Sequence, residues 1–178
     1  MSGDVEGYMA RLGRAMYWAD AGLKLRIMEE MRAHIADARA DGERVWKPSE
    51  APEVLAARYL QIYGFGRVFA GLCAVLAALA ALCSALILPL PSMEIVQLLA
   101  FSCALLIAAW CGIAGGRRSG AIVGAAGACA RVTGMTMNIA VLGWTIEPLF
   151  IALFLVSCAF LPFVGWGGGE ARKRWQGE

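Results

Sequence analysis

The sequence predicts an all-α protein in which a three-helix N-terminal domain precedes a bundle of four membrane-spanning helices. Three observations lead to this fold class: an apolar composition, an uneven distribution of charge, and apolar periods typical of helices. Of the 178 residues, 60% are hydrophobic and 17% are charged, whereas soluble domains have about 45–50% apolar and about 25% charged residues. Residues 1–67 contain ten of the sixteen basic and ten of the fourteen acidic residues. We therefore expect a charged domain (1–66), a membrane bundle (67–167) and a basic tail (168–178).

The charged N-terminal domain shows the apolar period of amphipathic helices in three segments, 3–19, 22–40 and 49–64. The apolar stripes are Val5, Tyr8, Met9, Leu12, Ala15, Met16 and Ala19, then Leu23, Ile27, Met31, Ile35 and Ala38, and finally Leu55, Tyr59, Ile62 and Tyr63. Ser49 is a suitable N-cap for the third helix, Pro52 fits its first turn, and Gly64 is a suitable stop. Three such helices can share one small core. Only Gly64-Phe65-Gly66 separates this domain from the first apolar run, so we expect it to act as a hinge.

Four runs of residues are long and apolar enough to be membrane helices: 68–90, 95–113, 121–144 and 149–166. A helix rises 1.5 Å per residue, so about 20 residues cross the hydrocarbon core of about 30 Å. Three of the runs have no charge, and the third contains only Arg131. The sequence therefore predicts four spans.

Basic residues at the ends of these runs predict the orientation. They are Arg58 and Arg67 before the first run, Arg117 and Arg118 between the second and third, and Arg172, Lys173 and Arg174 after the fourth. The two other connections contain no Lys or Arg. Because basic residues favour the cytoplasmic side, we expect a multi-pass protein of the cell membrane with both termini in the cytoplasm. The basic residues predicted to contact anionic lipid headgroups are Arg117, Arg118, Arg172, Lys173 and Arg174.

Arg131 lies about 15 Å along the third run, close to the membrane midplane. It shares one helical face with small and polar residues, which are Gly124, Gly127, Gly134, Asn138 and Thr145. A charge at this depth is costly and faces protein or water, so this face is expected to point into the bundle. Arg131, Asn138 and Thr145 form a candidate intramembrane polar site. The expected acceptors for Arg131 are Asn138, Ser102, Ser157, backbone carbonyls or water, and both an anion-binding and a purely structural role stay open.

Several function classes are not expected from this sequence. The six cysteines form no CxxC pair and His34 is the single histidine, so we expect no metal site and no cofactor. The bundle lacks paired carboxylates and an activated nucleophile, which argues against an enzyme. Residues 1–67 carry equal numbers of acidic and basic residues, unlike the basic face that binds nucleic acid.

Two adjoining segments resemble a known helical module. The segments are EEMRAHIADARADG (29–42) and SEAPEVLAARYLQIYG (49–64). The matching positions are Glu30, Met31, Arg32, His34, Ile35 and Ala38, followed by Pro52, Leu55 and Ala56. They resemble the HAAS ("heavily associated with sensor") domain, although Glu-Ala-Pro stands at 50–52 where that pattern has Gly-Asp-Pro. The resemblance covers about a third of the chain. It implies a cytosolic module on small membrane proteins, often associated with transcriptional regulators and transport systems, and it implies no catalytic residues.

The sequence thus predicts a regulatory or signalling protein of the lipid bilayer whose residues 1–66 bind a protein partner. Glu30, Arg32 and His34 are the candidate partner-binding face. His34 is expected at the edge of the apolar stripe, either packed and hydrogen-bonded to a neighbour such as Glu30 or acting as a pH sensor. The alternative function is a small transport-associated or ligand-binding bundle built around Arg131. Homo-oligomers through the small-residue faces stay open.

Overall fold

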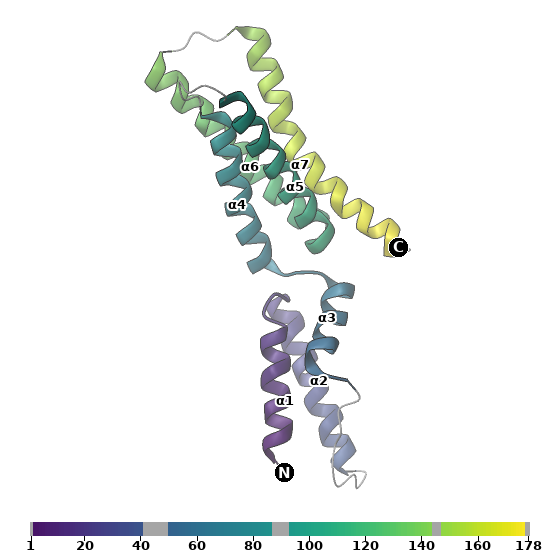
Figure 1. The fold of residues 1–178 in the computed structure, drawn as a ribbon. Helices are drawn as coiled ribbons and strands as arrows, with labels where there is room; N and C mark the ends of the chain where they lie inside the picture. Colours follow the sequence, from purple (N-terminus) through teal and green to yellow (C-terminus); the bar gives the residue numbers. More distant parts are fainter. Residues whose placement is uncertain (1, 41–49, 87–92, 144–146, 177–178) are drawn as a thin grey trace. The chain divides into compact units, whose positions relative to one another are not determined.

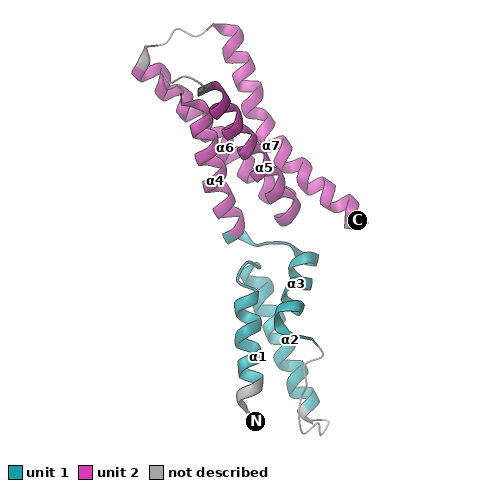
Figure 2. Ribbon diagram, in the orientation of Figure 1, with its two compact units in different colours: residues 1–68 teal, residues 69–178 magenta. Residues whose placement is uncertain are grey.

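A computed structural model describes residues 2–40, 50–86, 93–143 and 147–176, and this part of the chain is entirely helical (Figure 1). Its helices are α1 (Ser2–Ala15), α2 (Ala21–Ala40), α3 (Pro52–Tyr63), α4 (Arg67–Ala85), α5 (Met93–Gly115), α6 (Arg117–Leu142) and α7 (Pro148–Gln176). The chain forms two compact units (Figure 2), here called the N-terminal unit (1–68) and the C-terminal unit (69–178). The all-α class predicted from the sequence is confirmed for these residues.

The N-terminal unit has an apolar core to which each of its three helices contributes. The buried side chains are Tyr8, Met9, Leu12, Met16, Ala19, Ile27, Ile35 and Ala56. Most were predicted from the helical stripes, and Leu12 and Met16 are fully buried. The prediction for the end of α3 was wrong, because Ile62 and Tyr63 are 57% and 60% exposed. Leu60 packs against the core together with Ala56, so Ile62 falls at the edge of the contacting face and Tyr63 at the end of the helix.

The beginning of α3 is attached to α1 by polar contacts. The Tyr8 hydroxyl donates a hydrogen bond to the Glu50 carbonyl oxygen at 3.3 Å. Burial raises the pKa of this hydroxyl, and the nearby carboxylates of Glu50 and Glu53 act in the same direction, so it stays protonated as a donor. Arg58 pairs with the Glu50 carboxylate at 2.7 Å. These contacts hold the segment before α3 in place.

Glycines determine the end of α3 and the path to α4. Gly64 has φ of 83° and its N–H donates to the Leu60 carbonyl at 2.8 Å, so the predicted stop is confirmed. Pro52 occupies the first turn after Ala51, while Ser49, the predicted cap, lies outside the described residues. The Gly66 N–H donates to the Trp18 carbonyl at 2.7 Å. A Cβ on Gly66 would lie 2.6 Å from the Asp20 nitrogen, so the segment predicted to be a hinge is packed against the turn after α1.

The C-terminal unit is built from α4, α5, α6 and α7, with small side chains between the helices. Its core residues are Cys73, Ala77, Ala81, Ala104, Ala108, Cys111, Val123 and Leu161. Glycines bring the backbones of α5, α6 and α7 together: a Cβ on Gly120 would overlap Gly165 and Gly112, and a Cβ on Gly124 would overlap Leu161. Such close approach through small residues is typical of helix packing in membranes.

Three helices of the C-terminal unit are long and apolar enough to cross a membrane. They are α4 over Arg67–Ala85, α5 over Glu94–Gly115 and α7 over Pro148–Trp175. Their outward faces carry large exposed side chains such as Val75, Leu98, Leu106, Leu153 and Phe163, a surface that soluble proteins avoid. The helix α6 has 26 residues and is the least apolar of the four, since it carries Arg131, Asn138 and many glycines.

Residues 168–178 were predicted to be a basic tail separate from the last membrane helix. In the structure α7 continues as a helix through Gly167, Gly168 and Gly169 to Gln176. Three glycines in a row normally weaken a helix. Here a Cβ on Gly168 would overlap the Ala109 carbonyl, and a Cβ on Gly169 would overlap the Arg117 backbone. Packing of α7 on α5 and α6 therefore extends the helix into the segment predicted to be a separate tail.

Candidate functional site

The Arg131 side chain contacts aromatic rings from both neighbouring helices. Its guanidinium carbon lies 4.1 Å from the centroid of the Phe101 ring on α5 and 5.0 Å from that of Phe154 on α7. Cation–π contacts of this kind contribute about 2 kcal/mol when they are removed from water. Arg131 thus connects α5, α6 and α7 at the centre of the C-terminal unit.

The two serine hydroxyls predicted near Arg131 donate their hydrogen bonds to main-chain carbonyls. The Ser102 hydroxyl donates to the Leu98 carbonyl at 2.9 Å, and the Ser157 hydroxyl donates to the Phe154 carbonyl at 2.6 Å. Within the part of the chain that the structure describes, the Nε and Nη1 atoms of Arg131 are buried without a hydrogen-bond partner. Neither predicted hydroxyl therefore accepts from these two nitrogens, and both hydroxyls instead donate to a carbonyl about one turn back, as is common on helices.

Asn138 connects α6 to the end of α4 instead of to Arg131. Its side-chain amide donates to the Ala85 carbonyl at 2.5 Å. The last carbonyls of a helix have no partner within the helix, so this bond satisfies one of them. Gly124, Gly127 and Gly134 are buried on the same face of α6, which confirms that the face points inward. Thr145, the third member of the predicted polar site, lies outside the described residues.

The basic residues predicted to contact lipid headgroups divide into two groups. Arg117 pairs with Glu170 at 2.8 Å and lies 5.7 Å from the centroid of the Trp166 ring. Arg172 donates to the Ala114 carbonyl at 2.5 Å at the end of α5, a position where a cation also complements the helix dipole. The exposed members are Arg118, Lys173 and Arg174, for which headgroup contact stays a prediction. The sequence analysis missed Glu170, which reaches Arg117 from 53 residues further along the chain.

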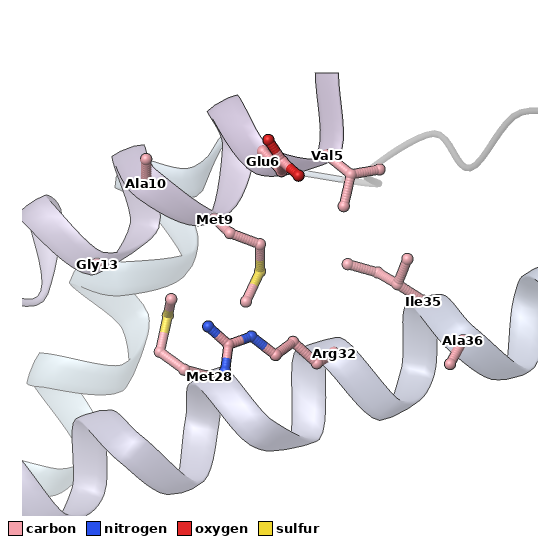
Figure 3. Close-up of a pocket in the computed structure, with 9 residues that line it drawn as sticks. All are labelled: Val5, Glu6, Met9, Ala10, Gly13, Met28, Arg32, Ile35 and Ala36. Carbon is pink, nitrogen blue, oxygen red and sulfur yellow. The ribbon is translucent and has the colours of Figure 1, made fainter. Parts of the chain in front are cut away.

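The N-terminal unit contains a groove of about 610 Å³ between α1 and α2 (Figure 3). Its lining is Val5, Glu6, Met9, Ala10 and Gly13 from α1 and Met28, Arg32, Ile35 and Ala36 from α2. Pockets that hold drug-sized ligands have volumes of about 300–1,000 Å³ and are mostly apolar with a few polar groups. This lining has the same character, with Arg32 and Glu6 as its charged members.

The groove includes one of the three residues predicted to form the partner-binding face. In Figure 3 the Arg32 side chain runs along α2, and its guanidinium lies between the ends of Met9 and Met28. Glu30 and His34 are exposed and do not line the groove. They stand two residues from Arg32 in either direction, which is about 200° around a helix. The structure therefore separates Arg32 from the other two, and His34 is not packed at the core edge as predicted.

Comparison with known proteins gives no further assignment. The chain matches no protein-family model, no curated protein and no solved structure. Among the described residues, no group of three or more His, Cys, Asp or Glu side chains could hold a metal ion. The groove and the Arg131 centre are therefore the two sites from which a function can be argued.

Proposed function

We propose that the protein is a regulatory membrane protein whose N-terminal unit binds another protein in the cytosol. The single observation that carries this proposal is the open groove between α1 and α2. Met9 belongs to the core of the unit and Met28 packs against that core, and both side chains also line this groove. Methionine-lined surfaces are common where a protein binds other proteins, because the side chain adapts its shape. The resemblance to the HAAS domain supports the same function.

The membrane arrangement that we propose has four spans and places both termini in the cytoplasm. Three spans are α4, α5 and α7, and α6 is the fourth. At 26 residues, α6 reaches about 39 Å along its axis. It packs against both α5 and α7 and carries its polar face inward. Four spans place Arg67, Arg117–Arg118 and the cluster at 172–174 on one side, as the distribution of basic residues favours.

The experiment that tests the proposed function is a photo-crosslinking scan of the full-length protein in its native membrane. A photoreactive residue is introduced in turn at exposed positions of the N-terminal unit, including His34, Ala36, Val54 and Ile62. We expect covalent adducts with one protein, recovered from at least one of these positions. Adducts with lipid alone, or with no molecule at any of the positions, would contradict partner binding by this unit.

A second candidate function, ligand binding at Arg131, has its own supporting observation. Two of its guanidinium nitrogens are buried with no acceptor among the residues that the structure describes, and a buried unsatisfied donor costs about 1–3 kcal/mol. An anionic group of a ligand could supply that acceptor. The experiment that separates binding from a structural role is replacement of Arg131 in the detergent-purified protein.

For a structural Arg131, we expect Arg131→Leu to leave the thermal midpoint unchanged or higher. The loss of unsatisfied donors, at about 1–3 kcal/mol each, offsets the loss of cation–π contacts of about 2 kcal/mol. Arg131→Ala should lower stability by about 2 kcal/mol or more, because it leaves empty space beside Phe101 and Phe154. If Arg131 instead binds an anion, oleate or phosphate should raise the midpoint of the wild-type protein and leave that of Arg131→Leu unchanged.

A further inference from the structure

Arg32 is an exposed, permanently charged residue of the groove, and Glu6 is the other charged residue of its lining. Its guanidinium makes no hydrogen bond or ion pair with the residues that the structure describes. Five of the other groove residues are Val5, Met9, Met28, Ile35 and Ala36, all apolar. Any occupant that covers this lining also removes water from the guanidinium. An uncompensated charge is expensive to remove from water, so the occupant must supply an acceptor.

The shape of the groove indicates what kind of occupant fits. The groove runs along two helices, and its lining residues recur about once per helical turn. They include Met9 and Gly13 on α1, and Met28, Arg32 and Ala36 on α2. The small, exposed Ala36 leaves room for an incoming side chain, while the ends of Met28 and Lys24 lie beside Gly13. A third helix laid along two others inserts apolar side chains at i, i+3, i+4 and i+7, which is the helix-in-groove mode of recognition. Ile35 and the two methionines offer apolar contacts for such anchors.

We infer that the groove binds an amphipathic helix of the partner protein, and that an aspartate or glutamate on that helix pairs with Arg32. This inference rests on the proposed partner-binding function and adds the site and the chemistry of the partner. A carboxylate is the acceptor best suited to a guanidinium, since the two groups form paired hydrogen bonds. Glu6 at the other side of the groove disfavours a second acidic group there and so favours one orientation of the helix.

The test compares two photo-crosslinking positions on α2 in the full-length protein in its native membrane. Ala36→p-benzoylphenylalanine places the probe at the groove, and His34→p-benzoylphenylalanine places it about 200° around the same helix. Both positions are exposed. We expect a protein adduct from Ala36 and little from His34, with the crosslinked peptide lying in an amphipathic helical segment that contains an acidic residue.

Charge reversal then tests the proposed ion pair. Arg32→Glu should reduce the adduct at position 36 about 30-fold or more, the range expected when one member of a buried charge pair is lost. Reversing the acidic residue of the partner to arginine should restore the adduct. Arg26→Glu is the matched control, because Arg26 is exposed on α2 outside the groove, and it should leave the adduct unchanged.

The outcomes separate failure of this inference from failure of the proposed function. A partner adduct from His34, Val54 or Ile62 but not from Ala36 would overturn the groove and leave partner binding intact. An adduct at Ala36 with lipid or with a second copy of this chain would also overturn the inference. An adduct that survives Arg32→Glu would overturn the ion pair. Failure to obtain a protein adduct from any surface position would contradict the proposed function itself.

Discussion

Replacement of Gly165 by alanine should disrupt the packing of the C-terminal unit. A Cβ on Gly165 would overlap the carbonyl group of Gly120, and both are main-chain positions that cannot move aside as a flexible side chain does. Overpacking costs about 1–3 kcal/mol where side chains can adjust, so we expect the upper end of that range or more. Alanine regains about 1 kcal/mol of helix propensity, which leaves a net loss of about 2 kcal/mol. Thermal unfolding of the full-length protein in detergent measures it.

Gly167 is the matched control, since it lies two residues further along α7. Among the described residues, a Cβ on Gly167 would meet no side chain and no neighbouring helix within 4 Å. Gly167→Ala should therefore gain up to about 1 kcal/mol from helix propensity alone. The two substitutions are chemically identical but have opposite predicted signs. Equal midpoints for the two variants would show that α7 does not pack on α6 through Gly165.

Replacement of Leu12 by alanine should unfold the N-terminal unit. Leu12 is completely buried at the centre of the core, and leucine-to-alanine changes in such positions cost about 2–5 kcal/mol. A helical unit of 68 residues buries a small fraction of its surface, and domains of about 60 residues are marginally stable. The loss is therefore comparable to the whole stability of the unit. Limited proteolysis of the full-length protein in detergent should show rapid cleavage within residues 1–66.

Leu25→Ala provides the control for this prediction. Leu25 is 64% exposed on α2, and surface substitutions change stability by about 0.5 kcal/mol or less. The same proteolysis should leave this variant as resistant as the wild-type protein, and the C-terminal unit should stay resistant in both variants. If Leu12→Ala were cleaved no faster than Leu25→Ala, the core described for the N-terminal unit would be wrong.

The helices could be predicted from the sequence because their signals are local. The apolar stripes of the first 64 residues and the long uncharged runs depend only on residue spacing along a helix. Proline at 52 and glycine at 64 mark ends by their own backbone preferences. The inward face of α6 was also predictable, since Gly124, Gly127, Gly134 and Asn138 repeat at helical spacing.

The contacts of the polar residues could not be predicted, because they depend on which helices meet. Phe101 and Phe154 lie 30 residues before and 23 residues after Arg131, and no spacing rule pairs them with it. The same holds for Arg117 and Glu170, which approach only because the glycines of α7 let it pack on α6. The extension of α7 through three glycines has this tertiary origin as well. A propensity argument predicts a break there.

The groove was the feature least accessible from the sequence. Met9 was predicted as a core residue and is buried, and no pattern in the sequence shows that it also lines a groove. Arg32 was grouped with Glu30 and His34 because the resemblance to the HAAS domain runs through all three. On the helix Arg32 points away from the other two, which share a face. Only the three-dimensional structure shows that Arg32 lines the groove and that Glu30 and His34 do not.

The central claim is that four helices cross the membrane with all three basic clusters on one side. Cysteine labelling in intact cells tests it directly, with a membrane-impermeant maleimide and single substitutions at Ser92, Ser119 and Thr145. The six native cysteines are free and lie in helices proposed to cross the membrane, so the wild-type chain gives the background. The account predicts labelling of Ser92→Cys and Thr145→Cys from outside, and of Ser119→Cys, beside Arg118, only after permeabilisation. Labelling of Ser119→Cys in intact cells would contradict it.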